Sequence, residues 1–341
     1  MSSVKDVAHG SRRNAYTALI LSTLAMIVCF MSWSNFAPLA SQVAEMFNLD
    51  VSQRTLLLAT PVLLGSIMRI PVGILSDRYG GKKVYLILMA FILIPLIMIP
   101  HVHSFGMLLF AALLVGMSGT SFAVGVSYAS VWFPPEQQGL ALGIVSMGNM
   151  GNAVAAMTLP YISKAAGFDS VYYFLIILTV IFGVLFAVFC KEMPVDKSKT
   201  IKGALSVATD SGTWYLSLFY FLTFGLFVAF TNLTPTFLTG MFHYTPVTAG
   251  LYSALFAFVC TLVRPFGGYL ADRKRPMALL QWVFVAIVIF AIWIMLSFHN
   301  QFMFIAGIVL VGLSAGIGNG VVFKMVPYVS QGNTGAVTGF V

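Results

Sequence analysis

The chain is 341 residues long; 59% of its residues are hydrophobic and only 8% are charged. Soluble domains carry about 25% charged residues, so this composition excludes an ordinary soluble enzyme or binding module. The formal net charge of +8 would suggest nucleic acid as the partner of a soluble protein, but membrane proteins gather Lys and Arg in cytoplasmic loops, so no nucleic-acid partner is expected.

Long apolar runs recur along the whole chain and predict an all-α polytopic membrane protein in a lipid bilayer. About 20 apolar residues in a helix cross about 30 Å of hydrocarbon. The first apolar run follows a polar, basic N-terminus and is too long for the core of a cleavable signal peptide, so it is interpreted as the first span. The predicted spans are 15–38, 53–76, 84–100, 106–131, 139–163, 170–190, 213–239, 248–271, 277–297 and 301–327, with an eleventh beginning near Gly335.

Basic residues concentrate in alternate loops, which predicts the orientation of the chain. One side of the predicted topology has only Arg54 and Lys164, whereas the other has thirteen Lys and Arg residues. Positive residues mark cytoplasmic loops, so we expect a multi-pass protein of the cell inner membrane with its N-terminus in the cytoplasm. The thirteen are Lys5, Arg12, Arg13, Arg78, Lys82, Lys83, Lys191, Lys197, Lys199, Lys202, Arg273, Lys274 and Arg275.

An internal repeat divides the chain into two related parts. The segment MRIPVGILSDRYGGKK at 68–83 is echoed by VRPFGGYLADRKRP at 263–276. An even number of predicted spans separates the two copies, so they are parallel repeats, and two parallel six-helix halves are the plan of the major facilitator superfamily. This predicts an N-terminal bundle at 1–190, a cytoplasmic linker at 191–212 and a C-terminal bundle at 213–341. The matched pairs, each 195 residues apart, are Arg69 with Arg264, Gly73 with Gly268, Asp77 with Asp272, and Arg78 with Arg273.

The second half is shorter than the first. GLALG at 139–143 matches GAVTG at 335–339, one residue off the register of the repeat. By this symmetry we expect the chain to be truncated just inside span eleven, lacking about 50 to 60 residues relative to a complete second half. A natural ten-span protein is the alternative, and it would leave the halves unequal.

The loop after the second span resembles the signature loop of major facilitator transporters. Its sequence GILSDRYGGKK, with Gly73, Asp77 and Arg78, fits the pattern G-x-L-x-D-R-x-G-x-[KR]-[KR], and a second copy contains Asp272 and Arg273. Asp77 can accept hydrogen bonds from neighbouring helix N-termini and Arg78 can pair across the cytoplasmic face, which would latch one access state. The alternative is a solvated charged turn.

Two arginines lie inside apolar spans without an acid nearby. Arg69 and Arg264 each precede the loop aspartate by eight residues, so they lie about 12 Å deep. An arginine near the bilayer midplane costs about 2.5–3.5 kcal/mol on translocon scales and usually faces a cavity. All ten acids lie outside the spans or at their edges, and a guanidinium cannot lose its proton. We therefore expect both arginines to converge on one site for an anionic substrate.

A glycine–asparagine run lies in the fifth span. The segment SMGNMGNAVAAM at 146–157 places Gly148, Asn149, Gly151 and Asn152 near mid-membrane. Glycines allow close approach of a helix or a ligand, and asparagines offer donors and acceptors. A small-residue packing face is the alternative interpretation. Span ten has a related run with Asn319 between two glycines.

The two runs, together with one arginine in each of spans two and eight, resemble the nitrate/nitrite porter family (NarK-type) of the major facilitator superfamily. The resemblance implies that Arg69 and Arg264 are the family's substrate-binding arginine pair. The family also lines its pocket with aromatic residues, which fits Phe122 in SGTSFA and Tyr220 and Phe224 in YFLTFG. Aromatic faces could sandwich a flat anion, although ordinary helix packing explains each ring about as well.

The remaining polar residues give no sign of an enzyme. Cys29, Cys190 and Cys260 are far apart, and the five histidines lie in the terminus or in loops, so neither a metal nor a cofactor is expected. Lys324 lies three residues before Pro327, where snorkelling to the interface explains it at least as well as attraction of substrate.

These features predict a nitrate/nitrite transporter, with nitrate and nitrite as its substrates, that works by alternating access as a monomer and serves nitrate assimilation. No acid or histidine within the spans offers a proton carrier, which favours an antiporter that exchanges nitrate for nitrite. The alternatives are a nitrate–proton symporter, a major facilitator transporter of another small anion, and an anion sensor that does not transport.

Overall fold

The computed structural model describes residues 11–194, 206–330 and 332–341, and every regular element in them is a helix. Ten helices or joined helix pairs within these residues are long and apolar enough to cross a membrane, which confirms the ten complete spans predicted from the sequence. Four of the basic residues used to predict orientation lie outside the described residues: Lys5, Lys197, Lys199 and Lys202.

The first six spans, together with the short helix α3 between the first two, comprise these elements in chain order: α2 (Arg12–Trp33), α3 (Ala40–Phe47), α4 (Val51–Ile67), α5 (Arg69–Tyr79), α6 (Gly81–Met98), η1 (Ile99–His101), α7 (Phe105–Val115), η2 (Gly116–Thr120), α8 (Ser121–Ser130), α9 (Pro135–Ser146), η3 (Met147–Met150), α10 (Gly151–Ala166) and α11 (Phe168–Phe189). After them come η4 (Ser206–Thr209), α13 (Ser211–Phe242), α14 (Pro246–Leu262), α15 (Arg264–Arg273), α16 (Pro276–Leu296), α17 (Gln301–Ser330) and α18 (Thr334–Phe340).

The sequence repeat corresponds to a repeat in backbone geometry. Span two breaks at Met68, with φ −76° and ψ −9°, and span eight breaks at Val263, with φ −82° and ψ −10°. Each break lies immediately before the intramembrane arginine, so Arg69 begins α5 and Arg264 begins α15. A proline follows each arginine within two residues, and its missing N–H interrupts the helical hydrogen bonding at this depth.

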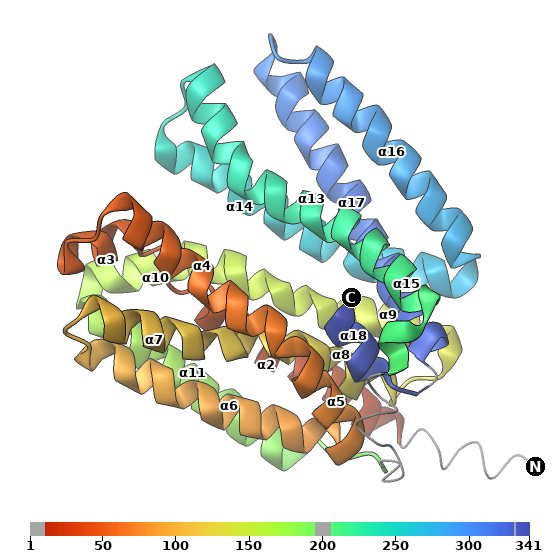
Figure 1. Cartoon of the computed structure of the whole chain (residues 1–341). Helices are drawn as coiled ribbons and strands as arrows, with labels where there is room; N and C mark the ends of the chain where they lie inside the picture. Colours follow the sequence, from red (N-terminus) through yellow and green to blue (C-terminus); the bar gives the residue numbers. More distant parts are fainter. Residues whose placement is uncertain (1–10, 195–205, 331) are drawn as a thin grey trace, which may run out of the picture.

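The two groups of six and four spans meet at one end of the molecule. In Figure 1 they converge where α5, α9, α15 and α18 lie, and they diverge toward the opposite end. At the convergent end, called the latch end below, α15 of the second group packs against α9, and α18 packs against α5. The latch end is therefore closed by two similar pairs of crossing helices.

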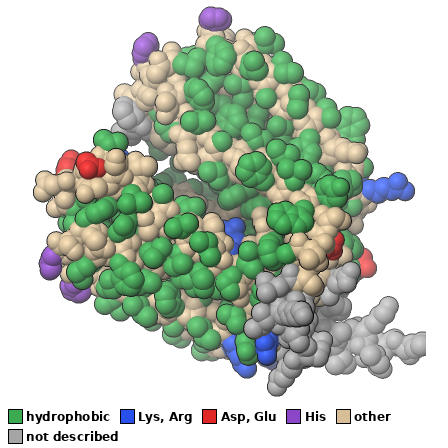
Figure 2. All heavy atoms as spheres, in the orientation of Figure 1, with side chains coloured by type: hydrophobic (Ala, Val, Ile, Leu, Met, Phe, Trp, Pro, Cys, Tyr) green, Lys and Arg blue, Asp and Glu red, His purple; other side chains and the backbone are tan. Residues whose placement is uncertain are grey.

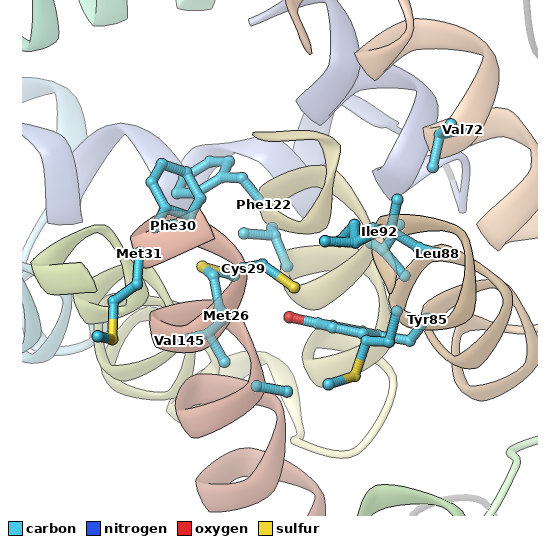
Figure 3. Close-up of a cluster of buried hydrophobic side chains, with 14 of the residues drawn as sticks. Met26, Cys29, Phe30, Met31, Val72, Tyr85, Leu88, Ile92, Phe122 and Val145 are labelled. Carbon is cyan, nitrogen blue, oxygen red and sulfur yellow. The ribbon is translucent and has the colours of Figure 1, made fainter. Parts of the chain in front are cut away.

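The core of the first group is built around α2. Figure 3 shows Met26 and Phe30 of α2 among side chains from several neighbouring helices, including Tyr85, Phe122 and Val145. All five are buried, and the Tyr85 hydroxyl donates a 3.2 Å hydrogen bond to a backbone carbonyl of α2. In a bilayer such packing stabilises by close van der Waals contact and interhelical hydrogen bonds, because lipid tails are as apolar as the side chains.

A carboxylate outside the spans caps the start of α6. Glu192 accepts hydrogen bonds from the backbone N–H groups of Lys82 (3.3 Å) and Lys83 (3.0 Å). Burial is the largest influence on this group and raises its pKa above the ordinary value, although the two N–H groups and the nearby lysine charges act in the opposite direction.

This cap gives a prediction for the pH dependence of stability. Because the folded-state pKa of Glu192 is raised, the folded protein binds a proton more tightly than the unfolded chain does, and stability from this group falls as pH rises from about 4.5. Glu192→Gln keeps the acceptor oxygen but cannot ionise. Wild-type protein should therefore lose thermal stability relative to Glu192→Gln between pH 4 and pH 7, measured by melting in detergent; a constant difference across that range would contradict the prediction.

Candidate functional site

The two intramembrane arginines come from opposite groups of helices and both face the interior. Arg264 is fully buried and its Nη1 donates a 3.2 Å hydrogen bond to the carbonyl of Ser146, at the end of α9. Arg69 is partly buried, and its Nε is enclosed. In Figure 2 a hollow lies between the two groups of helices, and a basic side chain is visible inside it.

Both guanidinium groups lie over aromatic rings. The Cζ of Arg69 is 5.7 Å from the ring centre of Phe122, and the Cζ of Arg264 is 5.7 Å from that of Phe224 and 5.6 Å from that of Phe227. At these distances the negative ring faces attract the cations, which offsets part of the cost of taking the charges out of water. The contact leaves the donor edges of the guanidinium groups free for other partners.

The same aromatic rings join the two halves. Tyr220 stacks on Phe224 with ring centres 4.9 Å apart and an interplanar angle of 10°. Phe323 makes edge contacts of 4.9 Å with both Phe122 and Tyr220, so α8 of the first half meets α13 and α17 of the second. Tyr220 also lies within electrostatic range of both arginines. The structure thus brings Phe122, Tyr220, Phe224 and the arginine pair to one place.

Several polar atoms at this depth have no hydrogen-bond partner among the described residues. They are Nε of Arg69, Nε and Nη2 of Arg264, Oδ1 of Asn149, Oδ1 of Asn152, and both side-chain amide atoms of Asn319. A buried polar atom left unpaired costs about 1–3 kcal/mol, and native proteins have few of them. These seven make up most of the thirteen such side-chain atoms, so the unsatisfied groups concentrate in the residues predicted to bind substrate.

No carboxylate neutralises either arginine within the part of the chain that the structure describes. The ion pair found there joins Lys324 and Asp272, away from both guanidinium groups. The same residues contain no cluster of three His, Cys, Asp or Glu side chains that could hold a metal ion. The site can therefore offer positive charge, amide groups and aromatic walls, a combination suited to holding a small anion.

The two glycines of the fifth span have a packing role in the structure. A Cβ added to Gly148 would overlap Met26, and one added to Gly151 would overlap the backbone at Ile27 and the side chain of Phe30. Both glycines therefore let α2 approach η3 and α10 closely. Of the two interpretations available from the sequence, helix packing accounts for them.

The latch aspartate of the first half holds a helix of the second half. Asp77 Oδ1 and Oδ2 accept 2.9 Å hydrogen bonds from the N–H groups of Gly335 and Ala336, at the start of α18. The Ser127 hydroxyl adds a 2.8 Å hydrogen bond to Oδ1. The helix N-terminal hydrogen bonding expected of Asp77 is thus present, and carboxylates are favoured there by the helix dipole.

The second aspartate makes the equivalent connection in the opposite direction. Asp272 accepts 2.8 Å hydrogen bonds from the N–H groups of Gly139 and Leu140, in the second turn of α9. Lys324 Nζ lies 2.6 Å from Asp272 Oδ1 and donates to the carbonyl of Pro135. Lys324 is only 2% exposed, so the interpretation that it snorkels to the interface is wrong, because a buried carboxylate holds it inside.

The two loop arginines stay on their own side of the latch end. Arg78 lies over the ring of Tyr79 at 5.4 Å, and Arg273 lies over the ring of Tyr269 at 4.3 Å. Among the described residues neither forms an ion pair across the two halves. An ion pair across the cytoplasmic face was predicted for Arg78 from the sequence, but the ring of the adjacent Tyr79 provides its contact instead.

Three contacts of the site were not anticipated from the sequence. Phe227 and Phe323 line it, and the carbonyl of Ser146 binds Arg264. Helical periodicity would have pointed to both rings, since Phe227 is seven residues after Tyr220 and Phe323 is four after Asn319. The contact with Ser146 has no sequence signal, because any residue supplies a carbonyl.

Comparison with known proteins identifies the family. The family model described as Major Facilitator Superfamily matches residues 22–341. The nitrite extrusion protein of Bacillus subtilis (strain 168) is 36% identical over 328 residues, which cover 95% of this chain and 82% of that protein. The probable nitrate transporter NarT of Staphylococcus carnosus (strain TM300) is 36% identical over 324 residues, which cover 95% of this chain and 83% of that protein.

A solved structure supports the fold independently. The human organic anion transporter MFSD10 (TETRAN) superposes with a TM-score of 0.74 at 13% sequence identity, covering 96% of this chain and 89% of its own. The named relatives are transporters and not enzymes, in agreement with the prediction from the sequence. The chain therefore belongs to the Major Facilitator Superfamily and, within it, to the nitrate/nitrite porter family.

Proposed function

We propose that this protein exchanges nitrate for nitrite across the cytoplasmic membrane by alternating access. The observation that carries the proposal is the pair Arg69 and Arg264, one partly and one fully buried, which come from opposite halves and have unpaired guanidinium nitrogens with no acid beside them among the described residues. The names of the relatives, a nitrite extrusion protein and a probable nitrate transporter, support the choice of anion.

The chemistry of the pocket suits a small, flat anion. Nitrate is planar with three equivalent oxygens, so a guanidinium can donate two parallel hydrogen bonds to one edge of it. Arg69 and Arg264 would supply these donors, and the Asn319 amide would add another. Phe122 and Tyr220 would cover the faces of the anion and exclude water, which strengthens the charged hydrogen bonds.

The two groups of helices are in contact at the latch end and diverge at the other end. This arrangement corresponds to one of the two access states of a transporter. Basic residues at the latch end, including Arg78, Lys82 and Arg273, mark that end as cytoplasmic by the positive-inside rule. In this state the site would open to the outside. Rocking of the two halves would then separate α15 from α9 and α18 from α5, and expose the same site to the cytoplasm.

Exchange is favoured over proton symport by the charges of the site. An empty site contains two uncompensated guanidinium groups, and closing the protein around them would desolvate both. If the site carries an anion in both directions of the transport cycle, the anion compensates the guanidinium charges and removes that penalty. Proton symport would need a group that accepts a proton, and the spans offer no carboxylate beside the arginines for this role. Nitrate and nitrite carry the same charge, so their exchange moves no net charge.

Uptake into proteoliposomes tests this directly. Vesicles loaded with nitrite should take up labelled nitrate at least about tenfold faster than vesicles loaded with an impermeant anion, since only loaded carriers would return. Nitrate entry into anion-free vesicles driven by an inward proton gradient would contradict exchange and indicate symport. Competition by acetate or phosphate equal to that by nitrite would indicate a different anion, and binding without any flux would indicate a sensor.

A further inference from the structure

Lys324 is a buried charge that the anion site does not use. It lies on α17, one residue after the pocket ring Phe323, with 2% of its side chain exposed. Its ammonium makes two strong contacts, a 2.6 Å ion pair with Asp272 of α15 and a hydrogen bond to the carbonyl of Pro135 of α9. The first partner belongs to the same half of the protein, and the second belongs to the other half.

Lys324 adds a charged contact across the halves at the Asp272 latch. At the Asp77 latch the neutral hydroxyl of Ser127, which belongs to the same half as Asp77, donates a hydrogen bond to the carboxylate. At the Asp272 latch the third donor is a cation that itself crosses the interface. The N-terminal part of α9 is thus held by two charged groups: the carboxylate of Asp272 binds the N–H groups of Gly139 and Leu140, and the ammonium of Lys324 binds the Pro135 carbonyl.

The same helix connects the lysine to the anion site. The helix α17 runs without interruption from Gln301 to Ser330, and Asn319, Phe323 and Lys324 follow one another within two turns. Asn319 has unpaired amide atoms in the pocket, and Phe323 contacts the rings on both halves. A shift of α17 at the pocket would move Lys324 relative to Pro135, because the helix transmits displacement along its axis.

We propose that Lys324 is a positioning residue that clamps the cytoplasmic gate closed while the site faces outward, and that α17 links release of this clamp to anion binding. The proposal rests on the alternating-access function above. It assigns Lys324 no direct contact with substrate. Its action is to hold Asp272 in place on α9 and to tie Pro135 to the second half.

The direction of the expected effect follows from burial. With Lys324→Met, Asp272 remains enclosed in the closed state without its counter-ion, and the contact with Pro135 is lost. Removing one partner of a buried ion pair is strongly destabilising, whereas water can solvate the same carboxylate once α9 and α15 separate. Both effects disfavour the closed state relative to the open one, so the population should shift toward cytoplasmic opening.

Distances between spin labels on the two halves provide the test. Gln137→Cys on α9 and Met277→Cys on α16 place labels on exposed positions at the latch end, in a background where Cys29, Cys190 and Cys260 are replaced by alanine. Without anion, Lys324→Met should raise the ratio of the long to the short distance at least about tenfold over the parent. Lys324→Arg keeps the charge and should stay within about threefold.

Ser127→Ala is the matched control, because it removes a side-chain donor to the aspartate of the other latch without removing a charge or a contact across the halves. Its distance distribution should stay close to that of the parent. Equal distributions in Lys324→Met and the parent, or an equal shift in Ser127→Ala, would overturn the clamp. If Lys324→Met does not fold, Asp272→Asn combined with Lys324→Met removes the unpaired charge, and a parent-like distribution in this double variant would overturn it as well.

A flux measurement separates this inference from the proposed substrate. A weakened clamp lets the empty carrier reorient, so Lys324→Met should show net nitrate entry into anion-free vesicles while its exchange rate changes less. If nitrate proves not to be the substrate, exchange is absent in the parent and net entry is absent in Lys324→Met, yet the spin-label shift remains. If the clamp is wrong, exchange persists in the parent and the shift is missing, so the two failures give different results.

Discussion

Arg69→Lys and Arg264→Lys are each expected to reduce nitrate–nitrite exchange by about 10- to 100-fold, since a hydrogen bond to a charged group contributes about 1.5–3 kcal/mol and lysine cannot reproduce the planar fork. Each substitution keeps the positive charge. A loss of exchange would therefore result from the changed geometry of the hydrogen-bond donors, because both variants retain the electrostatic attraction of the site.

The structure makes the lysine variants informative at each position. Arg264 uses Nη1 on the carbonyl of Ser146 and has Nε and Nη2 unpaired, so lysine could keep one contact or the other but not both. Arg69 lies over Phe122, and its Nε is unpaired. Binding of nitrate to purified protein, measured by calorimetry, should weaken in parallel with exchange, because the lost hydrogen bonds act on the bound anion.

Arg54→Lys is the matched control for these variants. Arg54 is at the end of the molecule away from the latch, and its Nη2 makes a long 3.4 Å contact with the Ser41 hydroxyl. Its replacement should leave exchange within about twofold of the parent, as expected for a weak contact at an exposed site. Near-normal exchange by either Arg69→Lys or Arg264→Lys would contradict bidentate recognition.

The sequence repeat predicted much of the site, because matched positions in two repeats that share a fold occupy equivalent places in the two halves. This holds even when no contact between residues is known. Matching Arg69 to Arg264 and Asp77 to Asp272 was enough to place two arginines at equal depth and two aspartates at the same end. The structure adds a matching break in the helix before each arginine. Parallel repeats share local sequence and therefore share local backbone geometry.

What the sequence could not supply depends on contacts between the halves. Lys324 has no counterpart in the first half, where Ala129 occupies the position 195 residues earlier, so the repeat gives no sign of its ion pair. Similarly, the sequence is compatible with Gly148 and Gly151 facing either the ligand or a neighbouring helix, and the position of α2 decides between these two interpretations. Such choices follow from tertiary packing and have no local signal.

The latches and the anion site share the same two short helices. In α5 the residue that faces the pocket is Arg69 and the one that holds α18 is Asp77; in α15 the equivalent residues are Arg264 and Asp272. Each pair is separated by about 12 Å of helix at 1.5 Å per residue. An anion that draws the two arginines together therefore acts on the same rigid segments whose other ends close the gate, which would couple occupancy of the site to opening.

Gly268→Ala is the second large effect expected, because the backbones of α15 and α9 touch at this glycine. A Cβ at Gly268 would overlap the carbonyl of Gly139, and the reciprocal contact leaves no flexible side chain to move aside. Overpacking of a well-packed contact costs about 1–3 kcal/mol, and here α15 can relieve it only by moving away from α9. Separation would also pull Asp272 from the N–H groups of α9.

The variant should therefore favour the state open to the cytoplasm and lower nitrate binding from the outside by roughly tenfold or more, in proportion to the loss of the outward-facing population. Gly250→Ala is the control, since a Cβ there meets nothing within 4 Å, and it should bind nitrate as the parent does. Outward-side binding that is unchanged in Gly268→Ala would mean that α9 and α15 are not held in contact when the site faces outward. The latch would then lie elsewhere, because the arrangement in which Asp272 binds the N–H groups of α9 also places an added methyl group on the carbonyl of Gly139.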